Sequence, residues 1–259
     1  MNIFRIGADS IHLLGMITIV YDIIHKRNCT GISGITQILY AQVFMSRYTD
    51  LLLYYVSIYN TFMKITYILM TFIAIILIFV VFRKSYDRKN DSIFHLLWTF
   101  PAALLAFKYN SISISDVRSY DDLSYYTEIL WSSSIYLEVV AIVPQYVMFR
   151  KTKNARCLYY VAMLCTYRSL YIANWIVRYF EENRYSSIAT VSGVIQAIIL
   201  IIVIIDIELN KEKPNPGKWR EIQDVFTVEA AKLAQPTKVK IQYPNNEQFG
   251  GQENQGLIY

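Results

Sequence analysis

Seven long apolar runs are the feature that most constrains the fold of this chain. A helix needs about 20 predominantly apolar residues to cross the hydrocarbon core of a bilayer. The runs cover residues 3–24, 34–57, 61–82, 93–109, 126–149, 157–180 and 186–209. We therefore predict an all-α membrane protein with seven transmembrane helices embedded in the lipid bilayer. Residues 1–209 form its membrane domain, and residues 210–259, which are polar, form a disordered tail.

Basic residues collect on one side of the predicted helices. The connections after the first, third and fifth runs and the start of the tail contain Lys26, Arg27, Arg83, Lys84, Arg88, Lys89, Arg150, Lys151, Lys153, Arg156, Lys211 and Lys213. The opposite connections have fewer basic residues, Arg118 and Arg184, and these lie among the acidic residues Asp116, Asp121, Asp122, Glu181 and Glu182. Basic loops remain in the cytosol, so we predict a lumenal N-terminus and a cytosolic C-terminus. The sequons at Asn28 and Asn90 then lie in the cytosol, and we predict that neither is glycosylated.

Three arginines, Arg5, Arg47 and Arg178, lie inside separate apolar runs. One arginine near the middle of a membrane costs ~2.5 to 3.5 kcal/mol, so three in a small bundle indicate a site for an anionic ligand. Other interpretations remain open. Arg5 can extend to the headgroups, and Arg178 can anchor its helix at the interface. Arg168 is a further buried candidate, for which a structural ion pair with Asp50 or Glu138 is the alternative.

Other polar residues share helical faces with these arginines, because positions i, i+4 and i+7 lie on one side of a helix. The four stripes are Arg5, Asp9 and His12; Arg47, Asp50 and Tyr54; Glu128, Trp131 and Glu138; and Tyr167, Tyr171, Asn174 and Arg178. Ionisable groups inside a membrane face the bundle interior or a water-filled cavity. We therefore expect the four stripes to converge on one polar cavity, where Tyr167 and Tyr171 can hydrogen-bond a ligand.

His12 is the side chain in these stripes that is suited to sensing pH, because the unperturbed pKa of histidine is about 6.5. Burial favours the neutral ring, whereas a nearby carboxylate such as Asp9 or Glu138 favours the charged ring. The sequence leaves both outcomes open.

The sequence argues against several other classes of protein. It contains no Gly-x-Ser-x-Gly elbow, no His-Glu-x-x-His pair and no phosphate-binding loop, so we expect neither an enzyme nor a cofactor or metal site. Cys29, Cys157 and Cys165 have no spacing that implies a disulfide framework. The net charge of +5 comes mostly from the predicted cytosolic flanks. It reflects topology, and we do not expect nucleic-acid binding.

Several segments contain motifs in an order typical of one known family. They are Met-Asn-Ile-Phe-Arg5 with His12-Leu-Leu, Cys29-Thr-Gly-Ile-Ser-Gly34, Arg47-Tyr-Thr-Asp50-Leu, Ser57-Ile-Tyr-Asn-Thr61 with Met63-Lys64, Glu128-Ile-Leu-Trp131, Ser134-Ile-Tyr-Leu-Glu138 with Ala141-Ile-Val-Pro-Gln145, and Tyr167-Arg-Ser-Leu-Tyr171 with Asn174-Trp175 and Arg178-Tyr179. From residue 1 to about residue 200 the chain resembles the ER lumen protein-retaining receptors, also called KDEL receptors.

This resemblance implies both a fold and a function. The fold is that of the SWEET sugar transporters, with two three-helix bundles joined by a linking helix. The function is pH-dependent sorting, in which C-terminal Lys-Asp-Glu-Leu or His-Asp-Glu-Leu signals of escaped ER residents are bound in the Golgi and returned to the ER. The resemblance also implies a multi-pass protein of ER and cis-Golgi membranes that meets the COPI coat in the cytosol. The alternative is a SWEET-like transporter of a small molecule such as a sugar, which has no need for three arginines.

The resemblance also assigns roles to residues. Arg5, Arg47 and Arg178 clamp the three carboxylates of the signal, Glu128 meets its basic first residue, and Trp131 packs against that residue. The motifs add Tyr48, Asp50, Tyr171 and Asn174 to the binding site. Protonation of His12 favours the anion-binding state, and a hydrogen bond between Glu138 and Tyr167 locks it. Lys211 and Lys213 are the candidate coat-binding residues. Which arginine binds which carboxylate stays open.

The chain departs from the family pattern in four places. The connection from Asn110 to Tyr126 is longer than usual, and the tail from Lys211 to Tyr259 is extended. Ser186 lies where the family has an aspartate, which removes one expected partner of Arg178. The last run lacks the family's transport-critical aspartate unless Asp206 replaces it.

Overall fold

The computed structural model describes residues 2–53, 55–110, 122–182 and 186–211 of the chain. The chain divides into two units, Met1–Glu212 and Lys213–Tyr259, and all described residues belong to the first. The described residues contain helices and turns but no strand. Two predicted residues lie outside the described residues: Tyr54, a member of the second stripe, and Lys213, one of the two candidate coat-binding lysines.

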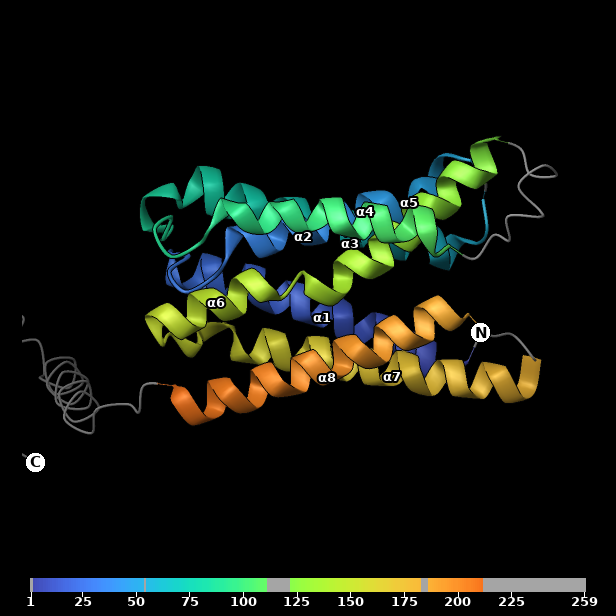
Figure 1. The fold of residues 1–259 in the computed structure, drawn as a ribbon. Helices are drawn as coiled ribbons and strands as arrows, with labels where there is room; N and C mark the ends of the chain where they lie inside the picture. Colours follow the sequence, from blue (N-terminus) through green and yellow to red (C-terminus); the bar gives the residue numbers. More distant parts are fainter. Residues whose placement is uncertain (1, 54, 111–121, 183–185, 212–259) are drawn as a thin grey trace, which may run out of the picture. The chain divides into compact units, whose positions relative to one another are not determined.

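Eight α-helices make up the described unit. They are α1 (Ile3–Lys26), α2 (Gly34–Arg47), α3 (Ile58–Ile76), α4 (Thr99–Lys108), α5 (Asp122–Val140), α6 (Val143–Thr152), α7 (Leu158–Glu182) and α8 (Ser187–Asn210). A π-helical turn, Leu77–Val81, continues α3, and 3-10 turns occupy Thr49–Leu52, Arg83–Ser85, Ile93–Trp98 and Ala155–Cys157. The long helices lie side by side in a bundle (Figure 1), in which α7 packs on α1 and α8 while α5 packs on α2 and α4.

Side-chain caps explain where four of the helices begin. Asn2, Ser33, Ser57 and Ser186 precede α1, α2, α3 and α8, and each side chain accepts a hydrogen bond from a backbone N–H in the first turn. Such caps satisfy donors that the helix itself leaves unpaired. Ser186 is the N-cap of α8, and its hydroxyl accepts a hydrogen bond from the Ala189 N–H at 3.4 Å. This is the position at which the chain was found to depart from the expected aspartate.

Two of the predicted runs are not single helices. The run 34–57 was expected to be one helix, but α2 ends at Arg47 and a 3-10 turn, Thr49–Leu52, follows. The stripe of Arg47 and Asp50 on one α-helix was therefore wrong. The run 126–149 is divided into α5 and α6, with Pro144 in the first turn of α6. Proline has no N–H to donate, so it is tolerated at a helix start and not in the helix interior.

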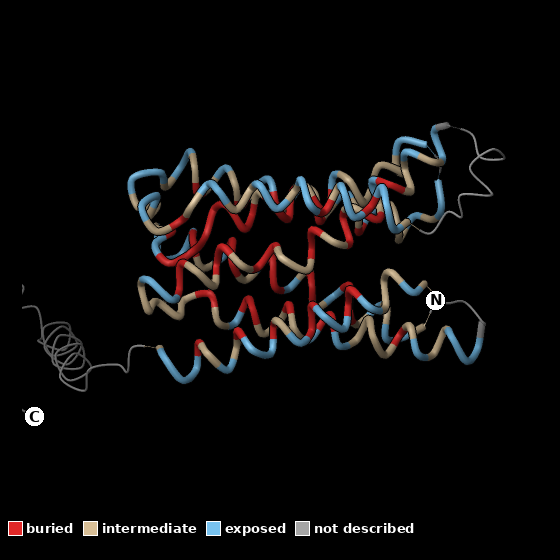
Figure 2. Tube along the Cα trace, in the orientation of Figure 1, coloured by how far each residue is buried: buried red, intermediate tan, exposed pale blue. Residues whose placement is uncertain are grey.

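Four helical segments are long and apolar enough to cross a membrane: Ile3–Lys26, Ile58–Val81, Leu123–Thr152 and Ser187–Asn210. Buried residues follow the faces that are turned toward the middle of the bundle, and exposed residues lie on the outside (Figure 2). Many of those exposed residues are large and apolar, including Ile17, Leu69 and Ile201. This is the pattern of an all-α membrane protein, because lipid accepts the apolar outer surface that water would disfavour.

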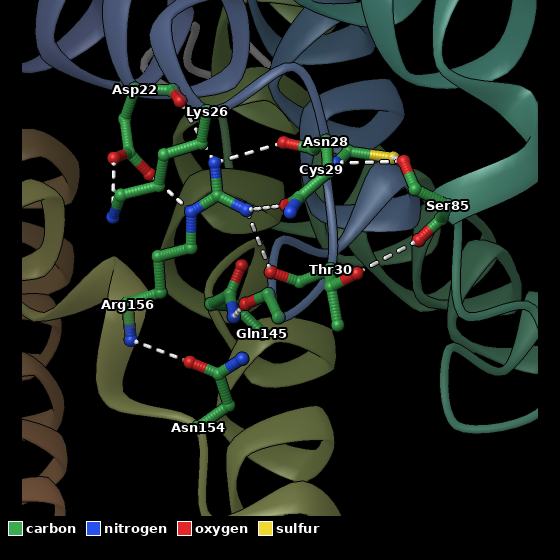
Figure 3. A network of polar contacts seen from close by, with 10 residues as sticks. Asp22, Lys26, Asn28, Cys29, Thr30, Ser85, Gln145, Asn154 and Arg156 are labelled. Atoms are coloured by element: carbon green, nitrogen blue, oxygen red, sulfur yellow. Dashed lines mark hydrogen bonds and ion pairs between the residues drawn. The ribbon is translucent and has the colours of Figure 1, made fainter. Parts of the chain in front are cut away.

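A polar network joins the connections at the basic end of the bundle, by which we mean the end that carries Lys26, Arg83 and Arg150 (Figure 3). Arg156 donates hydrogen bonds to the carboxylate and carbonyl of Asp22, to the side chain and carbonyl of Asn28, and to the carbonyl of Thr30. These bonds attach the turn before α7 to the end of α1 and to the loop that follows it.

Further contacts extend the network to α6 and to the turn Arg83–Ser85. The Gln145 side chain donates to the Gly31 carbonyl at 2.9 Å and accepts from the Ser33 N–H at 2.8 Å. The Cys29 N–H donates to the Ser85 hydroxyl at 3.0 Å. Gly31 has a φ of +83°, and a Cβ at this position would lie 2.5 Å from the Asn154 side chain. Glycine is therefore required there.

Candidate functional site

Two cavities lie at the opposite end of the bundle from the basic connections. The outer chamber, of about 870 Å³, is lined by the starts of α1, α5 and α8 and by the residues that follow α2 and α4. The inner chamber, of about 210 Å³, continues between α1, α3, α5 and α7. Both chambers are lined by Arg5, Arg47, Tyr48, Asn60, Lys64 and Trp131. A ligand of several residues can therefore enter through the outer chamber and reach the inner one.

Most of the candidate residues from the sequence line these chambers. Arg5, Arg47, Tyr48, Asp50, Glu128 and Trp131 line the outer chamber. His12, Glu138, Tyr167 and Tyr171 line the inner chamber, together with Arg5, Arg47, Tyr48 and Trp131. Asn174 is buried, and neither it nor Arg178 is among the lining residues of either chamber. Of the three arginines that motivated the anion site, the structure therefore brings two into one cavity.

The Glu138 carboxylate lines the inner chamber and binds two arginines there. It is 2% exposed and forms ion pairs with Arg47, at 2.6 Å, and with Arg168. The Tyr167 hydroxyl donates a hydrogen bond to the same carboxylate, as the resemblance implied. Asp50, the alternative partner of Arg168, is paired with Lys64 instead.

This arrangement leaves positive charge in the inner chamber, because two guanidinium groups share one carboxylate. Burying a charge costs several kcal/mol unless a counter-ion and hydrogen bonds compensate it. Arg47 has further partners in the hydroxyl and carbonyl of Ser134, at 3.1 and 3.3 Å, which are neutral.

The two chambers differ in some of the charged residues that line them. Glu128 lines the outer chamber and not the inner one, whereas Arg168 lines the inner chamber and not the outer one. Trp131 lies one turn after Glu128 on α5 and lines both chambers. Arg5, Arg47 and Lys64 line both chambers, so the two chambers differ, among other residues, in Glu128, which lines the outer one alone, and in Arg168, which lines the inner one alone.

His12 lies beside the Glu138 cluster. Its ring stacks on the Tyr167 ring with centroids 4.1 Å apart and an angle of 4° between the planes. The imidazole is buried, and its Nε2 has no hydrogen-bond partner within the described part of the chain. Tyr167 thus contacts both the His12 ring and the Glu138 carboxylate. A charge on His12 would therefore lie next to the Glu138 ion pairs.

Several site residues were not among the candidates from the sequence. These are Tyr59, Asn60 and Lys64, which line one or both chambers. Asp9 and Arg168, which the sequence did single out, line the inner chamber. Asn60 and Lys64 are four residues apart, so they share a face of α3, and this spacing was a signal that the sequence offered. Within the described residues, no group of three or more His, Cys, Asp or Glu side chains could hold a metal ion.

Comparison with known proteins identifies the family. The family model of the ER lumen protein retaining receptor matches residues 28–178, which is more than half of the chain. The chain belongs to the ER lumen protein-retaining receptor family. ER lumen protein-retaining receptor 3 of Mus musculus is 44% identical over 200 residues, which cover 76% of this chain and 88% of the mouse protein. ER lumen protein-retaining receptor erd-2.2 of Caenorhabditis elegans is 42% identical over 201 residues, covering 77% of this chain and 89% of the worm protein.

Two departures of this receptor from the family pattern concern the basic end. Asp206 on α8 forms an ion pair with Arg150 on α6 at 2.8 Å. Lys211, one of the two candidate coat-binding lysines, pairs with Glu208 one turn earlier. The first contact joins α8 to α6 at the end of the bundle that faces away from the two chambers, and the second lies at the end of α8 itself.

Proposed function

We propose that the protein is a pH-dependent sorting receptor, which binds C-terminal Lys-Asp-Glu-Leu or His-Asp-Glu-Leu signals of escaped ER-resident proteins and returns them from the Golgi to the ER. Membership of the family and the names of its relatives support the class of cargo. The observation that carries the proposal is a pair of connected chambers in which Arg5 and Arg47 line both, Glu128 lines the outer chamber alone and Arg168 lines the inner chamber alone.

The charged groups of the signal are complementary to these residues. Its first residue is basic, and two side-chain carboxylates and the terminal carboxylate follow. In the proposed complex, Glu128 and Trp131 meet the basic residue, while Arg5 and Arg47 each bind a carboxylate. The planar fork of arginine suits two-pronged contact with carboxylate oxygens.

The remaining proposed contacts come from residues around the chambers. Tyr48, Asp50 and Tyr171 line the chambers and complete the signal-binding site with Asn174. Arg178 is the proposed third clamp. It lies near the end of α7, and after a short connection the first residues of α8 line the outer chamber.

Binding would require Arg47 to exchange partners. Its guanidinium is held by Glu138 in the structure, so a ligand carboxylate competes with Glu138 for it. After the exchange, Arg168 and Tyr167 still hold the Glu138 carboxylate, so that no buried charge is left alone. This makes Glu138 and Tyr167 the proposed lock.

A proton on His12 favours this exchange, because positive charge next to the cluster attracts the ligand's carboxylates. The affinity therefore rises as pH falls toward that of the Golgi and is lost as pH rises toward that of the ER. A group that takes up one proton on binding changes the affinity by at most about tenfold per pH unit, since one pKa unit equals about 1.4 kcal/mol.

The proposed topology follows from the same family membership. The seven segments α1, α2, α3, α4, α5 with α6, α7 and α8 cross ER and cis-Golgi membranes as two three-helix bundles joined by α4. The basic end faces the cytosol and the N-terminus faces the lumen. Residues 1–209 form the membrane domain, and residues 210–259 form a cytosolic tail, in which Lys211 and Lys213 contact the COPI coat.

The test is binding of a panel of peptides to the full-length protein in lipid nanodiscs. Peptides ending in Lys-Asp-Glu-Leu and His-Asp-Glu-Leu are expected to bind near pH 6 and to dissociate near pH 7.4. The matched control is the same peptide with an amidated C-terminus, which lacks the terminal carboxylate and should not bind. Equal binding of the amidated peptide, or uptake of a sugar without peptide binding, would overturn the proposal.

A further inference from the structure

Asp9 is a buried carboxylate in the inner chamber that the mechanism above does not use. It is 5% exposed and lies between three helices. The Tyr59 hydroxyl of α3 donates to its carboxylate at 2.9 Å, and the Tyr171 hydroxyl of α7 donates to the other carboxylate oxygen. The Tyr67 hydroxyl donates to the backbone carbonyl of Asp9 at 2.8 Å. Hydrogen bonds to an ionised group are stronger than neutral ones, so this arrangement is held firmly.

These bonds determine what the two tyrosines can offer a ligand. A tyrosine hydroxyl has one proton to donate, and Tyr59 and Tyr171 both give theirs to Asp9. Their oxygens can then only accept hydrogen bonds from the chamber. A ligand carboxylate is itself an acceptor, so it cannot bind to either hydroxyl while Asp9 holds both protons. Tyr171 therefore holds a carboxylate of the protein itself, and in this arrangement it has no proton left to donate to a ligand.

Asp9 also lies beside the arginine at the entrance to the inner chamber. The Arg5 Nε is 4.0 Å from the Asp9 carboxylate, and the two residues are one turn apart on α1. On its other side, Arg5 donates to the Asn60 side chain at 3.4 Å. The Arg5 side chain is 39% exposed, so these two contacts orient the guanidinium over the chambers without enclosing it.

We propose that Asp9 is a positioning residue of the signal-binding site. It orients Arg5 over the chambers and turns the hydroxyl protons of Tyr59 and Tyr171 away from them, so that guanidinium and ammonium groups meet the carboxylates of the ligand. The proposal rests on the proposed function. It adds a residue that acts through Arg5 and the tyrosines and does not itself contact the signal.

The test compares the same substitution at two aspartates of α1. Asp9→Asn removes the charge but keeps one carbonyl acceptor, so one tyrosine loses its partner and Arg5 loses its counter-ion. Affinity for a Lys-Asp-Glu-Leu peptide is expected to fall about tenfold, the effect of weakening hydrogen bonds to a charged group. The matched control is Asp22→Asn at the basic end, which should lower thermal stability because Asp22 binds Arg156 but should leave peptide affinity unchanged.

A double-mutant cycle distinguishes positioning from a general structural effect. If Asp9 acts through Arg5, adding Asp9→Asn to Arg5→Lys should weaken binding by much less than it does in the wild-type receptor. Asp9→Glu, which keeps the charge, should bind more tightly than Asp9→Asn. Wild-type affinity in Asp9→Asn, or losses that add fully in the cycle, would overturn the proposal.

A second measurement separates this proposal from the proposed function. If the wild-type receptor binds no signal peptide, the proposed function fails, and the orientation of Arg5 can still be measured through its reaction with phenylglyoxal. Asp9→Asn should increase the rate of modification at Arg5 and leave that at Arg150 unchanged. Equal rates at Arg5 in both proteins would overturn the positioning role.

Discussion

Buried arginines occur at both ends of the bundle, but their surroundings differ. Arg156 at the basic end donates to five oxygens of three residues, including three backbone carbonyls (Figure 3). Arg47 and Arg168 share one carboxylate at the other end, and both line a chamber. The Nε of Arg168 and the Nε2 of His12 have no hydrogen-bond partner among the described residues.

The difference separates an arginine that holds the fold together from arginines that are available to a ligand. A buried polar group without a partner costs about 1 to 3 kcal/mol, so native proteins rarely keep one without a use. The Arg156 network satisfies its donors with the protein's own oxygens. The cluster of Glu138, Arg47 and Arg168 does not satisfy all of its donors in this way. It can therefore still bind an anion, and the unsatisfied groups lower the stability of the fold.

Replacing Arg156 by methionine should cause the largest loss of stability. The substitution removes one of the two cationic partners of Asp22 and the donor to three backbone carbonyls, and a buried acceptor left without its donor costs about 1 to 3 kcal/mol. Thermal unfolding of the purified protein should show a lower midpoint. The folded fraction should bind signal peptide with unchanged affinity.

Lys26→Met is the control for this substitution. Lys26 also pairs with Asp22, but its side chain is 52% exposed, and an exposed pair contributes about 0 to 1 kcal/mol. If Arg156→Met unfolds no more easily than Lys26→Met, the two ends of the bundle do not differ as described.

Arg47→Lys should give the largest loss of binding with little loss of stability. The ammonium keeps the charge but cannot make a two-pronged contact with a carboxylate. Losing one of two charge-assisted bonds should cost about 2 kcal/mol, roughly a thirtyfold weaker affinity in peptide titrations. Arg150→Lys, which alters an exposed pair at the basic end, should bind like the wild type. Undiminished affinity in Arg47→Lys would contradict its role as a clamp.

His12→Ala should flatten the pH response. The wild-type affinity is expected to change by up to about tenfold per pH unit, which one proton can supply, and the variant should show nearly equal affinity at pH 6 and pH 7.4. The control is His25→Ala, because His25 is exposed at the basic end and stacks on Tyr21. A full pH response in His12→Ala would mean that another group is the sensor.

The smallest expected effect concerns the two sequons at the basic end. Asn28 accepts a hydrogen bond from Arg156, and Asn90 donates one to the Asp87 carboxylate at 2.7 Å. In a cytosolic location neither receives a glycan, so treatment with a glycosidase should leave the mass of the expressed protein unchanged. A glycan at either position would reverse the proposed orientation of the bundle.

The polar stripes show how far the site can be predicted from sequence. Helical spacing placed His12 with Arg5, and Tyr171 with Tyr167, and all four line the chambers. Asp50 lines the outer chamber with Arg47, as the spacing predicted, but the predicted continuous α-helix was wrong, because α2 ends at Arg47 and a 3-10 turn follows. Where a helix ends inside an apolar run depends on contacts with other helices, here the contacts of Arg47 with Ser134 and Glu138. Hydrophobicity alone contains no such information.

Partners that are distant in sequence were the least predictable part. The sequence left Asp50 and Glu138 open as partners of Arg168, and in the structure Glu138 binds both Arg168 and Arg47. The pairing of Lys64 with Asp50 and of Tyr59 with Asp9 had no signal in spacing, because each pair joins different elements. Arg178 was placed with Arg5 and Arg47 by the same reasoning, and it does not line either chamber.

The sequence by itself determined that the chain is a helical membrane protein, which end of its helices is basic, and which side chains are too polar to face lipid. These properties follow from transfer free energies and helical periodicity, which act residue by residue. Tertiary structure alone decided which carboxylate neutralises which cation, and that two guanidinium groups compete for Glu138 while Arg156 is fully satisfied. Those outcomes depend on distances of a few ångströms between helices, at which electrostatic and hydrogen-bond energies are largest.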